Sequence, residues 1–246
     1  MALLISALAV IPLHAEDTQR LFIEANNAYD SGNYEVAAEG YTSLIAGGNE
    51  SWELYYNLGN AYYRLDEIGL AILNYERALR LAPTRREIKD NLALASSKTV
   101  DKIEELPRLF LVDWFHAIVN LSTPRGWRVV VLVLVVLLSA LLCIFFVASD
   151  YHLRKSMFII SFVAAFFLII SIINATFSAR NVTNSKEAII TAPMVVVKGS
   201  PDSKSLDKFV IHEGTKATVT DQQDEWWQIT LADGKSGWIN AGAEKI

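Results

Sequence analysis

The residues that most often carry catalytic chemistry are few and scattered in this sequence. Cys143 is the only cysteine, and the four histidines are His14, His116, His152 and His212. No second histidine or carboxylate follows His116 or His152 at the i+3 or i+4 spacing with which a helix holds a metal ion. His212 adjoins Glu213, but no nucleophile lies near it in sequence. No Ser-His-Asp, Cys-His, metal or phosphate-loop spacing occurs, so we expect no enzyme, no metal and no cofactor.

Composition places these residues on a chain that is too apolar for a wholly soluble protein. Hydrophobic residues make up 52% of the 246 residues and charged residues 20%, which excludes a disordered chain. The net charge of -5 offers no basic surface to a polyphosphate, so nucleic acid is not an expected partner.

Two uncharged segments are long enough to cross a membrane as helices. Residues 129–149 and 156–179 contain no charged side chain. We therefore predict transmembrane helices over 127–149 and 156–179, joined by a turn at 150–155. The alternative is a pair of buried helices in a soluble core.

Residues 1–15 have the pattern of a signal peptide, because residues 1–13 are apolar and the small Ala15 suits a signal-peptidase cut. No Lys or Arg precedes Arg20, so the alternatives are an uncleaved anchor or a start further upstream. A two-helix hairpin returns the chain to the side it left, which places both flanking segments together. The leader puts that side outside the cytoplasm, whereas the basic residues flanking the spans favour the opposite orientation.

Residues 18–98 repeat with a period of 34. The copy over 52–85 resembles the tetratricopeptide (TPR) repeat and carries eight of its signature residues: Tyr55, Leu58, Gly59, Tyr62, Ala71, Tyr75, Ala78 and Pro83. The copy before it is weaker, with Ala25 in place of the glycine, and the copy after it begins only one further helix. We therefore predict an α-helical TPR domain over 16–105 that ends in a capping helix.

The TPR resemblance implies a concave groove that takes an extended peptide. The positions that correspond to its lining are Phe22, Asn26, Tyr29, Tyr56, Asn60, Tyr63 and Arg64. The asparagines would hydrogen-bond a peptide backbone and Arg64 a carboxylate. The alternative is that the tyrosines are packing residues and that the capping helix closes the groove.

Residues 106–126 connect the helical domain to the first span. Their aromatic and aliphatic residues recur every three or four positions, which predicts an amphipathic helix at the membrane interface. Thr123 and Pro124 have the types that cap and open the next helix. The alternative is a helix that packs back on the repeats.

From residue 186 the hydrophobic period changes to two, which predicts a small all-β domain over 186–246. Its order of motifs resembles the bacterial SH3 (SH3b) barrel, with Glu213-Gly214-Thr215, a hairpin turn at Asp233-Gly234, and Gly237-Trp238-Ile239. Alternation places Trp227, Ile229 and Leu231 on one face and Trp226 on the other. Trp226 and Trp238 are the candidate ligand surface; the alternative is that they belong to the core.

A leader, a TPR domain, two spans and an SH3b domain, in this order, resemble BatE-type proteins of bacterial Bat aerotolerance operons. The resemblance implies a noncatalytic scaffold in the inner membrane with both soluble domains in the periplasm. Its expected partners are membrane lipid and other cell-envelope proteins, with the von Willebrand A-domain membrane proteins of the same operon as candidates. The alternative function is peptidoglycan binding through the SH3b domain, with the TPR domain as a spacer.

Overall fold

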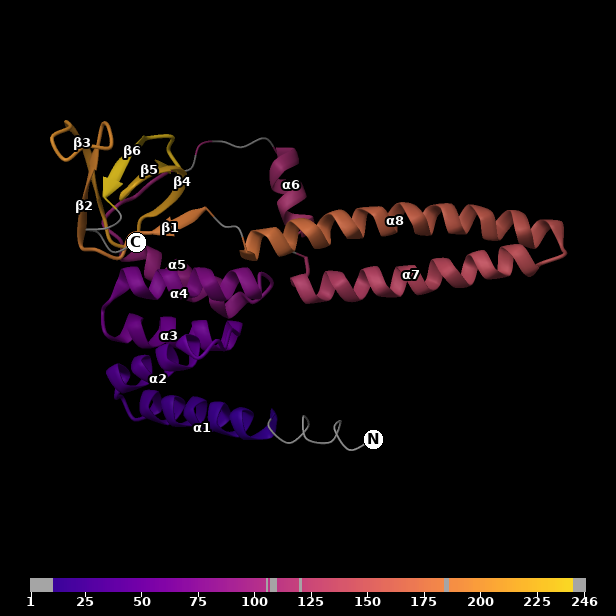
Figure 1. The fold of residues 1–246 in the computed structure, drawn as a ribbon, viewed down its shortest axis with the longest axis horizontal. Coiled ribbons are helices and arrows are strands. Elements are labelled where there is room, and N and C mark those ends of the chain that lie inside the picture. The colour runs from indigo at the N-terminus through magenta and orange to yellow at the C-terminus, as the bar shows by residue number, and fades with distance from the viewer. Residues whose placement is uncertain (1–10, 105, 107–109, 120, 184–185, 241–246) are drawn as a thin grey trace. The chain divides into compact units, whose positions relative to one another are not determined.

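The chain folds into two compact units, which Figure 1 shows as a ribbon. The computed structural model describes residues 11–104, 106, 110–119, 121–183 and 186–240. One unit contains the helical repeats and the C-terminal β domain, and the other contains the connector helix and the two long apolar helices. Residues 1–10 of the predicted leader and 241–246 of the predicted SH3b domain lie outside the described residues.

The repeats form a stack of antiparallel helix pairs (Figure 1). Ser51 caps the third helix by accepting a hydrogen bond from the Leu54 N–H at 3.2 Å, which fixes where the second repeat begins. The predicted capping helix ends at Ser97, earlier than the expected residue 105. The leader's expected cleavage point, Ala15, lies in the first helix, and its cleavage stays a prediction. The helices are α1 (Ile11–Asp30), α2 (Tyr34–Ala46), α3 (Trp52–Arg64), α4 (Ile68–Leu81) and α5 (Arg86–Ser97).

Close helix contact in the stack depends on a glycine in each repeat. A Cβ on Gly59 would lie 2.7 Å from ring atoms of Tyr75, so α3 and α4 meet only because that side chain is absent. The first repeat has Ala25 at the equivalent position, and there a glycine on the facing helix α2 leaves room for the close contact. A Cβ on Gly40 of α2 would lie 2.9 Å from the Cβ of Ala25. The departure from the repeat signature at Ala25 is therefore compensated by Gly40.

The C-terminal domain is an antiparallel sheet of six strands in the order β1-β4-β5-β6-β2-β3. Gly234 has φ +86°, as the predicted hairpin turn requires. Among the described residues the sheet keeps β1 and β3 as edges, so the closed SH3b barrel remains a prediction. The strands are β1 (Glu187–Ile189), β2 (Met194–Lys198), β3 (Asp207–His212), β4 (Lys216–Gln223), β5 (Trp226–Leu231) and β6 (Ser236–Asn240).

The second unit contains α6 (Phe110–Val119), α7 (Pro124–Val147) and α8 (Tyr151–Thr183), and α7 and α8 lie side by side (Figure 1). Segments Arg125–Val147 and Tyr151–Arg180 are long and apolar enough to cross a membrane. Thr123 caps α7 through the Gly126 N–H at 3.1 Å, as predicted.

The connection between the two long helices is shorter than the predicted turn at 150–155. Asp150 accepts the Leu153 N–H at 2.7 Å, and this N-cap starts α8 at Tyr151. Arg154 and Lys155 therefore lie in the first turns of a helix.

The connector helix α6 packs against α8 through the ring of Phe115, which meets Phe177 edge-on at 5.2 Å between ring centroids. Phe110 and Trp114 remain 75% and 65% exposed. The helix therefore has one face on α8 and a second, aromatic face without cover from the described residues.

Candidate functional site

Two hydrogen-bonded groups of identical composition occur in the helical stack, which we call the first and the second station. In the first station Asn26 Oδ1 accepts bonds from the Tyr41 hydroxyl at 2.7 Å and from Asn57 Nδ2 at 3.2 Å. In the second station Asn60 Oδ1 accepts bonds from the Tyr75 hydroxyl at 2.7 Å and from Asn91 Nδ2 at 2.9 Å. Each member of the second station lies 34 residues after its counterpart. The stations therefore repeat with the period of the sequence.

The phenols of both stations are held in their neutral, donating form. Burial raises the pKa of Tyr41 to about 12, and the nearby negative charge of Asp30 adds to this effect. Burial likewise raises the pKa of Tyr75. Because Tyr41 and Tyr75 are each 1% exposed, their hydroxyls depend on Asn26 and Asn60 for hydrogen bonds. The two asparagines thus have a packing role that their spacing in the sequence did not indicate.

The first station opens into a cavity of about 300 Å³. Side chains from α1, α2 and α3 surround it, and most of them are polar. The lining residues are Asn26, Tyr29, Asp30, Tyr41, Asn57 and Asn60. This volume lies at the lower end of the range of small-ligand sites, and a few residues of an extended chain would fill it.

Three of the predicted groove residues, Asn26, Tyr29 and Asn60, line this cavity. Phe22 instead lines a second hollow of about 310 Å³, between the start of α1 and the α2–α3 connection. Tyr56 adjoins the second station, where its hydroxyl accepts a bond from Asn91 Nδ2 at 3.0 Å.

Two further predicted groove residues, Tyr63 and Arg64, take part in cation–π contacts. Lys98 Nζ lies 4.4 Å from the ring centroid of Tyr63, and the Arg64 guanidinium lies 4.4 Å from that of Tyr34. Arg64 is an exposed residue. Burial raises the pKa of Tyr29, and the positive charge of Arg64 opposes the rise.

Sequence reasoning missed Asn57 and Asn91, which donate to the central asparagine of each station. Their own 34-residue spacing was the signal that could have found them. It was weak because both asparagines fall outside the signature positions of the repeat.

Comparison with protein families supports the helical assignment. Residues 52–85 match the tetratricopeptide repeat family. The TPR repeat therefore covers α3, α4 and the segment that leads to α5. Such repeats bind proteins and are typically noncatalytic. No curated protein shows a match to the chain.

The two tryptophans proposed as a ligand surface lie on the same face of neighbouring strands. Gln228 pairs with Trp238 and Trp226 with Asn240, so the two indoles are diagonal neighbours. Trp238 is only 8% exposed, whereas Trp226 is half-buried. The opposite face contributes Ile229 and Leu231 to the core, and Trp227 packs against it, as the alternation predicted.

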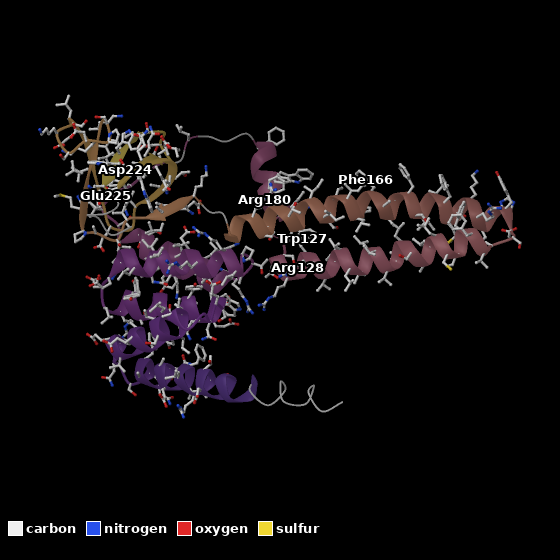
Figure 2. All side chains as sticks on the ribbon, in the orientation of Figure 1. Trp127, Arg128, Phe166, Arg180, Asp224 and Glu225 are labelled. Carbon is white, nitrogen blue, oxygen red and sulfur yellow. The ribbon has the colours of Figure 1, made fainter. Side chains whose placement is uncertain are left out.

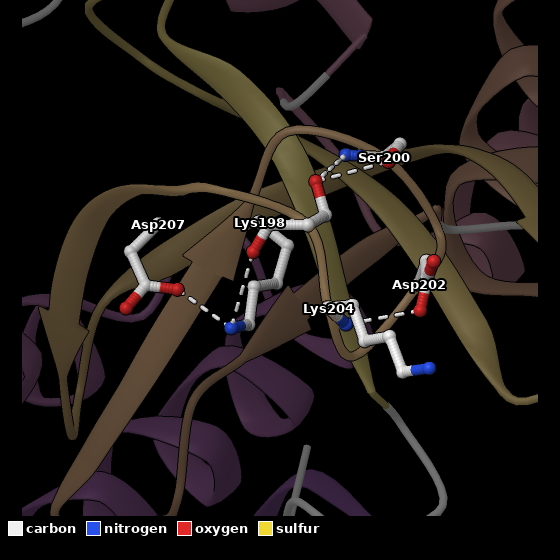
Figure 3. A network of polar contacts seen from close by, with 6 residues as sticks. Lys198, Ser200, Asp202, Lys204 and Asp207 are labelled. Atoms are coloured by element: carbon white, nitrogen blue, oxygen red, sulfur yellow. Dashed lines mark hydrogen bonds and ion pairs between the residues drawn. The ribbon is translucent and has the colours of Figure 1, made fainter.

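The polar residues of the loop after β2 bind one another (Figure 3). Lys198 Nζ contacts Asp207 at 2.6 Å, and the hydroxyl of Ser205 accepts bonds from the Ser200 N–H and hydroxyl at 3.0 and 2.9 Å. This network closes the loop and shows no arrangement that would activate a serine. Across the part of the chain that the structure describes, no three His, Cys, Asp or Glu side chains gather in a metal-binding group.

Proposed function

We propose that this protein is a membrane-anchored adaptor that binds an extended segment of a partner protein along the two stations. The duplication of the stations is the observation that carries this proposal. Asn26 and Asn60 use their carbonyl oxygens inside the stations, which leaves their Nδ2 groups as donors towards a ligand. Asn57 and Asn91 use their Nδ2 groups and keep their carbonyl oxygens as acceptors. Each station thus offers the donor and acceptor that a peptide group needs.

The side chains around the stations suit a peptide more than a small apolar ligand. Tyr29 and Tyr63 offer aromatic area, which forms strong contacts in protein interfaces. Arg64 supplies a charge for an acidic residue or a C-terminal carboxylate. The partner would therefore be an extended segment with an acidic group near Arg64.

The surface of the helix pair supports membrane anchoring. Phe146 and Phe162 are 76% and 72% exposed, and Figure 2 shows Phe166 directed away from the pair. Exposed apolar area costs about 25 cal/mol per Å² in water, and lipid would remove that cost. Trp127, Arg128 and Arg180 lie towards one end of the pair (Figure 2), where indoles and cations meet headgroups.

The order of segments supports the finer proposal of a BatE-type scaffold in the bacterial inner membrane. The leader would place both soluble domains in the periplasm, close to other cell-envelope proteins. Peptidoglycan binding is the weaker alternative, since burial of Trp238 leaves Trp226 as the main indole for stacking on a sugar. Protease added to spheroplasts should digest both soluble domains, and protection of both domains would reverse the topology.

Photocrosslinking in cells tests the groove. A benzophenone amino acid at Tyr29 or at Tyr63 should capture a partner protein. The matched control is Val36, which is 58% exposed on α2 and belongs to neither station. Capture at Tyr29 and Tyr63 but not at Val36 supports the groove. Equal capture at all three positions, or none at Tyr29 and Tyr63, contradicts it.

A further inference from the structure

The segment after α5 is bound to the β domain through one carboxylate. Asp101 Oδ2 accepts hydrogen bonds from the His212 backbone N–H at 2.7 Å and from the Thr215 hydroxyl at 2.6 Å. Its Oδ1 lies 3.0 Å from His212 Nδ1. Burial opposes ionisation of Asp101, but the bonds from Thr215 and His212 outweigh it and lower the pKa of Asp101. We call Asp101, His212 and Thr215 the clasp.

The same turn of the β domain also contacts α4. The Glu213 carboxylate accepts the Gly69 N–H at 3.2 Å, in the first turn of α4, where an unpaired amide and the helix dipole favour an anion. Lys216 Nζ lies 3.1 Å from Glu76, whose side chain is 14% exposed. The β domain therefore binds α4 and the segment that directly follows α5.

Two glycines, one on each side, allow this contact. A Cβ on Gly69 would lie 2.9 Å from the Ile190 carbonyl oxygen. A Cβ on Gly214 would lie 2.5 Å from Thr99 Cγ2 and 2.8 Å from Ile72 Cδ1. Neither side can accept even one added carbon without a shift, so the surfaces are closely complementary.

Helix α5, which precedes the Asp101 segment, has few buried residues of its own. In α5 only Ile88 and Ala95 are buried. Yet α5 supplies Asn91 to the second station, and Lys98 directly after it lies over Tyr63. In a repeat array the next helix pair would cover such a helix. Here Thr99 and Asp101 lead instead into the contact with the β domain.

We propose that the β domain is the C-terminal cap of the helical stack, and that its docking positions α5 so that Asn91 completes the second station. Partner binding in the second half of the groove then depends on clasp residues that touch no ligand. The dependence rests on the groove proposed above, whereas the capping itself does not. Asp101, Thr215 and Gly69 are positioning residues in this scheme.

Hydrogen exchange of the full-length protein in detergent tests the capping without any ligand. Asp101→Ala removes three contacts to the β domain, so amides of residues 86–97 and 207–216 should exchange about tenfold faster or more. Thr215→Val removes one contact, keeps the shape of the side chain, and should produce a smaller change in the same segments. The matched control is Asp90→Ala, which removes an exposed carboxylate of α5 that pairs with Arg86 of the same helix. Unchanged exchange in both clasp variants, or an equal change in the control, overturns the proposal.

Crosslinking at the groove positions tests the dependence. Asp101→Ala should reduce capture at Tyr63 severalfold and change capture at Tyr29 less, because Tyr29 lies at the first station. If Asp101→Ala speeds hydrogen exchange but leaves capture at Tyr63 unchanged, partner binding does not depend on the clasp. The proposed groove is unaffected by that result. If the unaltered chain captures nothing at either position, the groove function fails, and the exchange measurement still decides whether the β domain is a cap.

Discussion

The two stations share one arrangement of hydrogen bonds, but the second station has one additional bond to a neighbouring side chain. The ring centroids of Phe22 and Tyr41 lie 6.1 Å apart, and those of Tyr56 and Tyr75 lie 6.0 Å apart, so Phe22 and Tyr56 occupy equivalent places. The Tyr56 hydroxyl binds Asn91, whereas Phe22 has no hydroxyl to offer Asn57. The first station therefore has one internal bond fewer, and it borders a polar cavity of about 300 Å³ that Asn60 of the second station also lines.

The two repeats also differ in where the small residue sits. The second repeat has Gly59 on α3 and Asn74 on α4, and the first has Ala25 on α1 and Gly40 on α2. Both repeats have the same Asn–Tyr–Asn hydrogen bonds, although the glycine lies on α2 in the first repeat and on α3 in the second. Close contact between paired helices thus requires one small residue at the crossing, on either side of it.

The largest effect is expected for Gly59→Trp in the second repeat. A single Cβ there already meets the Tyr75 ring at 2.7 Å, and Tyr75 is 1% exposed and cannot move away. The indole should lower the free energy of unfolding by about 3 kcal/mol or more. Thermal unfolding of the full chain, followed by circular dichroism, measures the loss. An unchanged melting temperature would refute the packing of α3 on α4.

A double-variant cycle at Ala25 and Gly40 tests whether the glycine has changed helices. Gly40→Ala brings two Cβ atoms to 2.9 Å, and the overpacking of about 1–3 kcal/mol exceeds the gain of about 1 kcal/mol in helix propensity. Ala25→Gly alone costs about 1 kcal/mol in helix propensity. The double variant restores one alanine facing one glycine and should unfold close to the original temperature. Simple additivity of the two losses would show that Ala25 and Gly40 do not compensate each other.

Exchanging Phe22 and Tyr56 tests the difference between the stations. Tyr56→Phe removes the bond to Asn91 and should cost about 0.5–1.5 kcal/mol. Phe22→Tyr gives Asn57 a hydroxyl partner, should stabilise the fold by up to about 1 kcal/mol, and should reduce capture at Tyr29. Chemical unfolding of the two variants, compared with the unaltered chain, measures both shifts. Equal effects of the same sign would remove the distinction between the stations.

The smallest effect is expected from alkaline titration, in which both stations should behave alike. The pKa of Tyr41 is raised to about 12 and that of Tyr75 is also raised, so folding favours their neutral forms. This stabilisation is complete below the unfolded tyrosine pKa of about 10 and is lost as pH rises from there through the folded pKa. Tyrosinate absorbance should show both phenols neutral at about pH 11 while exposed tyrosines ionise. If Tyr41 ionised near pH 10, the Tyr41→Phe variant would show less tyrosinate absorbance at that pH than the unaltered chain. That result would contradict the burial of Tyr41.

The sequence predicted the elements of the site better than its contacts. The TPR signature located α3, α4 and Asn60, and the weaker copy before it located Asn26 on α1. It did not reveal that their carbonyl oxygens are already bound by Tyr41, Asn57, Tyr75 and Asn91. A hydrogen bond between side chains 31 residues apart depends on the angle between helices, and no local pattern encodes that angle.

Local periodicity by itself determined the helical repeat, the two apolar helices and the alternating strands, because each of these patterns expresses contacts within a few residues. The caps at Ser51 and Thr123 are local in the same sense. The junction of the repeats with the β domain was decided only in three dimensions. Asp101 meets His212 across 111 residues of sequence, and Gly214 fits against Ile72 and Thr99. A single carboxylate and a single glycine produce no periodic pattern in the sequence. Their role depends on surfaces that exist only after both domains have folded.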